Sequence, residues 1–308
     1  MATASDEIVF RTVGLSKRYG QRLAVDALDI SVRRGQVFGF LGPNGAGKTT
    51  TIACALGLIA PTAGHVELFG LDTRAERAEA LRRTGSTLEG QSYFPHLTAR
   101  DNLRIWAAIS QGVDQPRIDE VLDLVGLRDR ARDKVRNYSL GMKQRLAVAA
   151  AIMHRPEMVI LDEPTNGLDP AGIREFRDLI RELARGGMTV FVSSHILSEV
   201  EQMCDDVGIL KAGRLITQGP VSSLKRDSTS IELSTTDDAG ALKLFAGMPW
   251  AAGARLRDGH IVVDAPRGRA AEISRALGEA GIWLTELRPA ASTLADFFLE
   301  VTGDGGTR

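Results

Sequence analysis

One stretch of the sequence has the residue types and spacing of a phosphate-binding loop. The segment Gly42–Thr49 fits the pattern G-x-x-x-x-G-K-[ST]. Its glycines let the backbone turn several N–H groups toward one point, where an anion can bind. Lys48 adds a mobile positive charge for outer phosphates, and the hydroxyl of Thr49 suits Mg²⁺. The candidate phosphate-binding residues are Gly42, Pro43, Asn44, Gly45, Ala46, Gly47, Lys48, Thr49 and Thr50.

The segments on either side of this loop favour the same interpretation. The apolar run Val37–Leu41 predicts a buried strand before the loop, and the pattern from Thr49 to Leu56 predicts a helix after it. A new helix points its positive N-terminus at the loop, which adds to the attraction for phosphate. The alternative is a glycine-rich turn with a solvated lysine. Such a turn would not explain why a strand precedes the loop and a helix follows it, so the context favours a phosphate-binding loop.

A second set of polar residues stands at the ends of other predicted strands. The apolar run that begins at Met158 ends in two acids, Asp162 and Glu163. Burying acids at the end of a strand is costly unless they have a function. Asp162 suits a Mg²⁺ ligand, and Glu163 suits a base that takes a proton from an attacking water. His195 follows the predicted strand Thr189–Ser193, at a position where ligands bind in parallel sheets.

Four further residues each have a structural and a functional interpretation. Ser139 and Gly141 open a predicted helix, and they are either ordinary caps or part of a second anion site at its N-terminus. Tyr19 is either a surface aromatic or a platform on which an adenine ring stacks. Asp169 is expected to cap the helix that begins with the next residue.

The composition is that of an ordinary globular protein. The chain has 308 residues, of which 44% are hydrophobic and 25% charged, and its net charge is −1. This charge predicts no general attraction to nucleic acid or anionic lipid. Apolar runs such as Leu146–Met153 are too short to span a bilayer, and the N-terminus has no secretory pattern. Cys54 and Cys204 are expected to be buried, reduced thiols, and a cytoplasmic location follows.

The pattern of expected elements divides the chain into two domains. Residues 1 to about 225 are expected to contain both strands and helices, with a largely helical insertion at about 90–155, and they form the first, α/β domain. The composition changes at 225–229, where we expect a linker. Residues 226–308 then read β-α-β-β-α-β-α, an order that suggests a small ferredoxin-like α+β domain whose last helix covers Leu294–Val301.

Taken together and in this order, the motifs resemble those of the nucleotide-binding subunit of an ABC transporter. The resemblance covers roughly Ile8–Lys225. It pairs Gly42–Thr49 with Walker A, Ser139–Gly141 with the signature, Ile160–Glu163 with Walker B, Asp169 with the D-loop, His195 with the switch histidine, and Tyr19 with the adenine-stacking aromatic.

The resemblance implies a fold, a reaction and partners. The fold would be a P-loop NTPase of the ABC type, with a mixed sheet core, an antiparallel β subdomain and a helical subdomain. The reaction would be hydrolysis of ATP with Mg²⁺, inside a head-to-tail dimer of two nucleotide-binding subunits. The dimer, expected to be two copies of this chain, would drive an integral-membrane permease from the cytoplasmic face of the membrane.

The resemblance also implies a role for each matched residue. Lys48 and Thr50 would bind phosphates, and Thr49 and Asp162 would hold Mg²⁺. Glu163 would polarise the attacking water, and His195 would contact the γ-phosphate. Ser139 and Gly141 would reach the γ-phosphate bound to the other copy.

Two departures from the usual motifs narrow the subfamily. Glu89 stands where the family usually has a glutamine; its carboxylate can still meet Mg²⁺, but it lacks the amide donor. The signature reads Tyr-Ser-Leu-Gly-Met-Lys-Gln instead of the usual Leu-Ser-Gly-Gly-Gln. Both departures resemble those of the drug, lantibiotic and bacitracin-type efflux ATPases, which implies export of a drug-like or peptide- or lipid-like compound.

A soluble mechanical ATPase that acts on ribosomes or DNA is the alternative from another class. Such proteins need tandem cassettes or long coiled-coil insertions. This chain has one phosphate loop, a short insertion and a net charge of −1, so it has no electrostatic footprint for nucleic acid.

Overall fold

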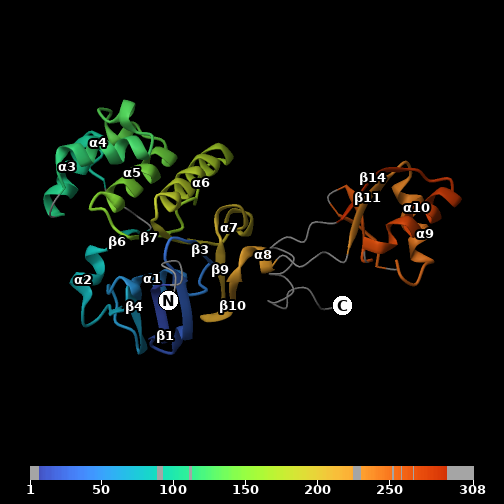
Figure 1. The fold of residues 1–308 in the computed structure, drawn as a ribbon, viewed down its shortest axis with the longest axis horizontal. Helices are drawn as coiled ribbons and strands as arrows, with labels where there is room; N and C mark the ends of the chain where they lie inside the picture. The colour runs from blue at the N-terminus through green and yellow to red at the C-terminus, as the bar shows by residue number, and fades with distance from the viewer. Residues whose placement is uncertain are drawn as a thin grey trace. The chain divides into compact units, whose positions relative to one another are not determined.

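The computed structural model describes residues 7–88, 93–110, 113–224, 230–251, 253–257, 259–265 and 267–289. Figure 1 shows the fold. The described residues up to Ser222 form one compact unit, and those from Ser223 onward form another. Three predicted features lie outside the described residues, namely Glu89, the linker at 225–229 and the last helix at Leu294–Val301.

A six-stranded mixed sheet forms the centre of the larger unit. Its strands lie in the order β10 (Arg214–Pro220), β9 (Asp206–Lys211), β3 (Val37–Leu41), β8 (Thr189–Ser194), β7 (Met158–Asp162) and β6 (Thr84–Thr87). Neighbouring strands pair in parallel, except that β10 pairs with β9 in the antiparallel direction. Every residue of β3, β7 and β8 is buried, as expected for strands that read as continuous apolar runs. The parallel pairing brings the carboxyl ends of β3, β7 and β8 to one edge of the sheet.

A four-stranded antiparallel sheet packs beside it. Its order is β2 (Arg22–Arg33), β1 (Ile8–Tyr19), β4 (Ala63–Leu68) and β5 (Leu71–Asp72). The sequence predicted strands only at 8–13 and 27–32, because register shifts after Thr12 and after Leu15 break the simple alternation of apolar and polar residues. The longer hairpin carries Tyr19 at its end.

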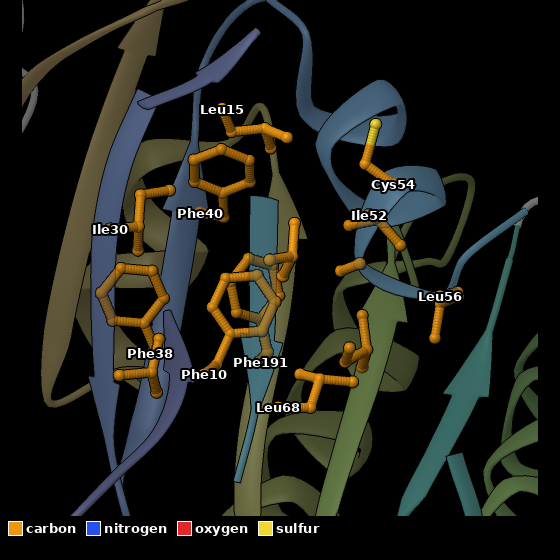
Figure 2. Close-up of a cluster of buried hydrophobic side chains, with 14 of the residues drawn as sticks. Phe10, Leu15, Ile30, Phe38, Phe40, Ile52, Cys54, Leu56, Leu68 and Phe191 are labelled. Atoms are coloured by element: carbon orange, nitrogen blue, oxygen red, sulfur yellow. The ribbon is translucent and has the colours of Figure 1, made fainter. Parts of the chain in front are cut away.

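Four phenylalanines hold the two sheets together (Figure 2). The ring of Phe191 on β8 lies 4.9 Å from Phe10 on β1, 5.5 Å from Phe38 and 5.4 Å from Phe40 on β3, measured between centroids. All four side chains are fully buried. Such rings bury large apolar areas and pack in tilted or offset pairs. The cluster therefore holds β3 and β8 in place against β1, and the ends of β3 and β8 carry the candidate site.

Helices lie between and after the strands described so far. They are α1 (Lys48–Ala55), α2 (Arg77–Arg82), α3 (Ala99–Ile109), α4 (Gln115–Leu124), α5 (Leu140–Ile152), α6 (Pro170–Arg185), α7 (Leu197–Met203) and α8 (Val221–Leu224). Helices α3, α4 and α5 gather in one group, green in Figure 1. Side-chain caps at Thr98, Asp114, Ser139 and Asp169 start α3, α4, α5 and α6. No helix in the described ranges combines the length and apolar character needed to cross a bilayer.

The smaller unit is a four-stranded antiparallel sheet with helices. Its strands lie in the order β12 (Arg255–Arg257), β13 (His260–Val263), β11 (Ile231–Thr235) and β14 (Leu284–Pro289), and its helices are α9 (Asp238–Ala246) and α10 (Ala270–Glu279). It has its own apolar core, which includes Phe245 and Ile273. The chain order β-α-β-β-α-β with split strand pairs is the ferredoxin-like arrangement predicted from the sequence.

An ion-pair cluster ties together the opposite edge of the central sheet. Glu157, just before β7, contacts Arg34 at 2.6 Å and Arg83 at 2.5 Å. The guanidinium group of Arg83 has the larger effect and that of Arg34 the smaller. Both favour the charged carboxylate and lower the pKa of Glu157 to about 2. Since Arg83 and Arg34 lie just before β6 and β3, the cluster joins the entry points of three strands.

Replacing Glu157 by glutamine is expected to flatten the acid branch of the stability profile. Because the folded pKa is depressed, the stability from this group is present above the ordinary value of 4.5 and is lost as pH falls toward 2. At pH 7 the change should cost about 1 kcal/mol, a value kept low because the ion pairs are partly exposed. Thermal unfolding at pH 7 and pH 3 measures this. The exposed acid Glu79 on α2, changed to glutamine, is the control, and equal pH dependence in Glu157→Gln and wild type would contradict the prediction.

Candidate functional site

The phosphate loop connects the end of β3 to the start of α1. Gly47 stands directly before the helix with φ of 111°, a left-handed conformation that favours glycine. A Cβ atom at Gly47 would lie 2.5 Å from the carbonyl oxygen of Ala24, and one at Gly42 would lie 2.5 Å from that of Leu210. Glycine is therefore required at Gly47 by backbone conformation, and at both positions by close packing.

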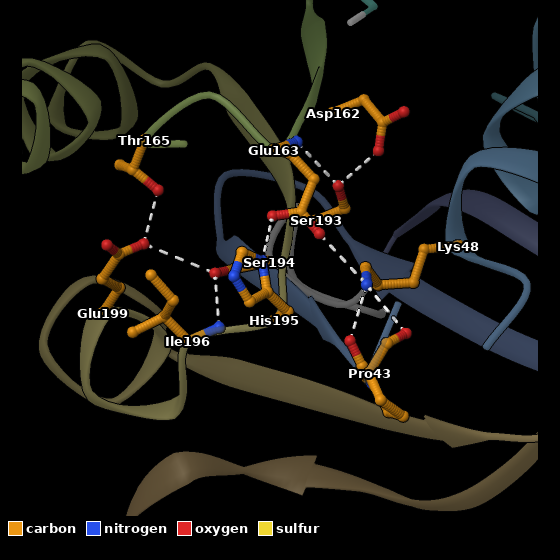
Figure 3. Close-up of polar contacts among 11 residues, drawn as sticks. Pro43, Lys48, Asp162, Glu163, Thr165, Ser193, Ser194, His195, Ile196 and Glu199 are labelled. Atoms are coloured by element: carbon orange, nitrogen blue, oxygen red, sulfur yellow. Dashed lines mark hydrogen bonds and ion pairs between the residues drawn. The ribbon is translucent and has the colours of Figure 1, made fainter. Parts of the chain in front are cut away.

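Lys48 lies at the base of this loop and is only 5% exposed. Its Nζ donates to the carbonyl oxygens of Gly42 at 2.6 Å and Pro43 at 3.3 Å, and it pairs with Oε1 of Glu163 at 3.1 Å (Figure 3). A buried ammonium group needs such partners. The lysine is thus held in the loop by backbone carbonyls, with one carboxylate contact that a phosphate oxygen could replace.

Glu163 joins Lys48 to His195. Its other oxygen, Oε2, lies 2.8 Å from Nδ1 of His195, and since a carboxylate only accepts, Nδ1 carries the proton. The backbone of Glu163 has φ of 47°, a strained conformation for a residue other than glycine. Strain of this kind is tolerated where the surrounding structure fixes a side chain in a functional position.

Ser193, the last but one residue of β8, orients both acids at the end of β7. Its Oγ donates to Oδ1 of Asp162 at 2.5 Å and accepts from the backbone N–H of Glu163 at 2.9 Å. These contacts leave Oδ2 of Asp162 buried without a hydrogen-bond partner among the described residues. A buried, unpartnered carboxylate oxygen is a suitable ligand for a hard cation such as Mg²⁺. In the described part of the chain, no group of three or more His, Cys, Asp or Glu side chains is arranged so that it could hold a metal ion by itself.

A pocket of about 500 Å³ contains most of the predicted residues. It is lined by Tyr19, Arg22, Ala24, Asn44, Gly45, Gly47, Lys48, Thr49, Thr50, Glu163, Asn166 and His195. Its volume lies in the range of sites for small ligands. Tyr19 stands at its edge, 49% exposed, with Lys17 Nζ 5.0 Å from the ring centroid. The remaining loop residues Gly42, Pro43 and Ala46 shape the loop from outside the lining.

The predicted signature residues lie apart from this pocket. Ser139 is exposed and accepts a hydrogen bond from the N–H of Met142 at 3.2 Å, which caps α5. A Cβ atom at Gly141 would lie 3.7 Å from the side chain of Leu168. Next to Leu168, Asp169 caps α6 by accepting from a backbone N–H. The structure therefore places these three predicted residues together at the starts of α5 and α6, outside the pocket lining.

Sequence reasoning missed several residues of the site, among them Ala24, Arg22, Asn166 and Ser193. Arg22 lines the pocket because β2 begins directly after the turn that follows Tyr19, and the predicted strand started too late to show this. Asn166 lies three residues after Glu163, in a loop without a recognisable pattern. Ser193 had one available signal, since a serine in a fully buried strand requires a hydrogen-bond partner.

Replacing Ser193 by alanine is expected to lower kcat for nucleotide hydrolysis about tenfold, because losing a buried hydrogen-bond partner costs roughly 1–3 kcal/mol. The change removes the hydrogen-bond partner of both Asp162 Oδ1 and the backbone N–H of Glu163. Phosphate release by the purified chain measures the effect. Ser86→Ala on β6, which is separated from β8 by β7, serves as the control, and an unchanged kcat in Ser193→Ala would refute the orienting role.

The fold and the site define a class of protein, a P-loop nucleotide hydrolase of the cassette type. A family model described as ABC transporter matches residues 25–166. The chain is 43% identical over 300 residues to the bacitracin transport ATP-binding protein BcrA of Bacillus licheniformis, covering 96% of this chain and 98% of that one. It is 36% identical over 299 residues to the daunorubicin resistance ATP-binding protein DrrA3 of Streptomyces coeruleorubidus, covering 94% of this chain and 95% of that one.

Solved structures show the same fold. CbiO1 from Clostridium perfringens, part of the ABC transporter complex cbiONQ, superposes with a TM-score of 0.65 at 25% identity, covering 71% of this chain and 91% of that one. The chain belongs to the ABC transporter family of ATP-binding subunits, which hydrolyse ATP. The family, fold class and ATPase activity predicted from the sequence are confirmed, and the mechanical ATPase is not favoured.

Proposed function

We propose that this chain powers export of an antibiotic-like compound through a separate membrane permease. The observation that carries the proposal is similarity over almost the whole length to BcrA, whose name describes bacitracin transport, and to DrrA3, whose name describes daunorubicin resistance. Both matches extend through the smaller unit as well as the ATPase unit, since they cover 96% and 94% of this chain. In this proposal the ATP-binding motifs of the chain supply the energy for transport, and the permease is a separate subunit.

The residues of the pocket have complementary roles in this proposal. The loop amides and Lys48 would bind the phosphates of ATP, and Tyr19 would support the adenine ring. Glu163 would accept the proton of the attacking water, with its carboxylate oriented by the Nδ1–H of His195. Asp162 and Thr49 would hold Mg²⁺, which supplies charge neutralisation at the phosphates when bound. The buried, unpartnered oxygen of Asp162 supports this assignment.

A head-to-tail dimer of two copies accounts for the isolated position of Ser139 and Gly141. These residues lie outside the pocket, and Ser139 and the adjacent Leu140 are exposed. In the dimer they would contact the nucleotide held by the other copy. The permease would place this dimer on the cytoplasmic face of the membrane. A net charge of −1 supports a partner other than nucleic acid.

The test combines partner identification with a functional assay. The tagged chain is purified from detergent-solubilised native membranes, and we expect a stoichiometric polytopic protein to accompany it. Cells that lack the gene should become sensitive to compounds like bacitracin or daunorubicin, and the wild-type chain but not Glu163→Gln should restore resistance. Recovery of the chain with ribosomal or DNA-associated proteins, together with unchanged sensitivity, would overturn the proposal.

A further inference from the structure

A buried hydrogen-bond network links the loop that carries Glu163 to the loop that carries His195 (Figure 3). Its centre is Glu199 on α7, which is only 7% exposed. Oε2 of Glu199 accepts a hydrogen bond from Thr165 Oγ1 at 2.5 Å and another from Ser194 Oγ at 3.4 Å. Glu199 does not line the nucleotide pocket, so none of the roles given above accounts for it.

One arm of the network reaches Glu163 through Thr165. Thr165 follows Glu163 by two residues, and the loop between them is tightened by a hydrogen bond from the N–H of Asn166 to the carbonyl of Glu163 at 3.2 Å. Thr165 is itself buried. With so short a connection, a shift of Thr165 would move the backbone of Glu163 and of the pocket residue Asn166.

The other arm reaches His195 through Ser194. Ser194 directly precedes the histidine, and its Oγ also accepts from the N–H of Ile196 at 3.0 Å, so hydrogen bonds hold both sides of the histidine. The carbonyl of Ser194 accepts from the N–H of Gly42 at 3.2 Å. The loop anchored by Glu199 is therefore also joined to the phosphate loop.

Keeping an acid at this position has a cost. Oε1 of Glu199 is buried without a hydrogen-bond partner among the described residues. Burying a polar group without a hydrogen-bond partner is unfavourable for folding. Glu199 is among the residues that line a cavity of about 320 Å³, together with Arg174 and Arg177 of α6 and Gln202 of α7. A costly buried acid that bridges two active-site loops indicates a functional requirement.

We propose that Glu199 is a positioning residue for ATP hydrolysis. It holds the Thr165 loop and the Ser194 loop at the separation that brings Glu163 Oε2 within 2.8 Å of His195 Nδ1. It acts through these loops and touches neither the nucleotide nor the attacking water. The inference rests on the proposed roles of Glu163 and His195 in hydrolysis.

Steady-state kinetics of the full-length chain test the proposal. For Glu199→Ala we expect kcat to fall at least about tenfold while KM for ATP stays within about twofold, because binding groups are untouched and only the alignment of the hydrolytic groups changes. Glu199→Gln should recover kcat to within about threefold of wild type, since its amide oxygen can accept both hydrogen bonds. Glu79→Gln on α2 makes the same chemical change at an exposed acid outside the network and should leave both parameters unchanged.

A double-mutant cycle separates positioning from general destabilisation. Thr165→Val by itself should lower kcat. The double variant Thr165→Val with Glu199→Ala should have a kcat within about twofold of that of Glu199→Ala, because Glu199→Ala already removes the hydrogen bond that Thr165→Val removes. All variants are compared at a temperature where thermal unfolding shows them folded. A wild-type kcat in Glu199→Ala, a glutamine variant as impaired as the alanine variant, or additive losses in the cycle would overturn the inference. Absence of turnover in the wild-type chain, or full turnover in Glu163→Gln, would instead refute the hydrolytic roles proposed above for Glu163 and His195.

Discussion

Glu163→Gln is expected to reduce ATP turnover at least about a hundredfold, since a positioned general base contributes roughly 10²–10⁴ to the rate. Glutamine has nearly the same shape but cannot take the proton of the attacking water. The amide oxygen can still accept from His195 Nδ1, so the pocket should keep its form. Phosphate release under saturating ATP measures the loss.

The same variant is expected to bind ATP more tightly than wild type by several-fold. In the structure Glu163 Oε1 pairs with Lys48, so the phosphates must displace a carboxylate from the ammonium group. Neutral glutamine removes this competitor, and a persistent ATP-bound dimer should accumulate. Fluorescent ATP analogues and size-exclusion chromatography measure affinity and dimerisation. Glu79→Gln on α2 provides the matched change at an exposed site, and wild-type turnover in Glu163→Gln would refute its role as the base.

Lys48→Ala is expected to weaken ATP binding by about a hundredfold, because charge-assisted contacts to phosphate are lost from a buried site. The carbonyl of Gly42 and Oε1 of Glu163 would also lose a partner each. Titration with a fluorescent ATP analogue measures the dissociation constant. Lys243→Ala on α9, an exposed lysine in the other unit, should leave affinity unchanged. Near-normal affinity in Lys48→Ala would remove the lysine from the phosphate site.

The local elements of the site could be predicted from sequence because their patterns are local. Strand β3 has the predicted bounds, and α1 begins one residue before the predicted start, since an apolar run, two glycines and a lysine fix strand, loop and helix over a short stretch. Likewise β7 ends at Asp162, where the sequence changes from apolar to acidic. Parallel pairing then explains why these segments meet at one edge.

What the sequence could not give were contacts between distant residues and irregular strands. Ser193 and Glu199 act on Asp162 and Thr165, residues about thirty positions away, and no periodicity encodes such hydrogen bonds. The register shifts in β1 hid the length of the first hairpin and with it the place of Arg22 in the pocket. Glu89, predicted as a metal ligand, lies outside the described residues, so its role stays a prediction.

The separation of Ser139 from the pocket of its own chain has a consequence in genetics. In the proposed dimer each site would take its lysine from one copy and its signature serine from the other. A chain altered at Ser139 would then impair the site of a normal partner, while its own pocket remains complete. When both kinds of chain are made in one cell, random pairing puts roughly half of the dimers in this mixed state. Loss-of-function alleles at Ser139 would therefore act partly dominantly, whereas alleles that prevent folding would be recessive.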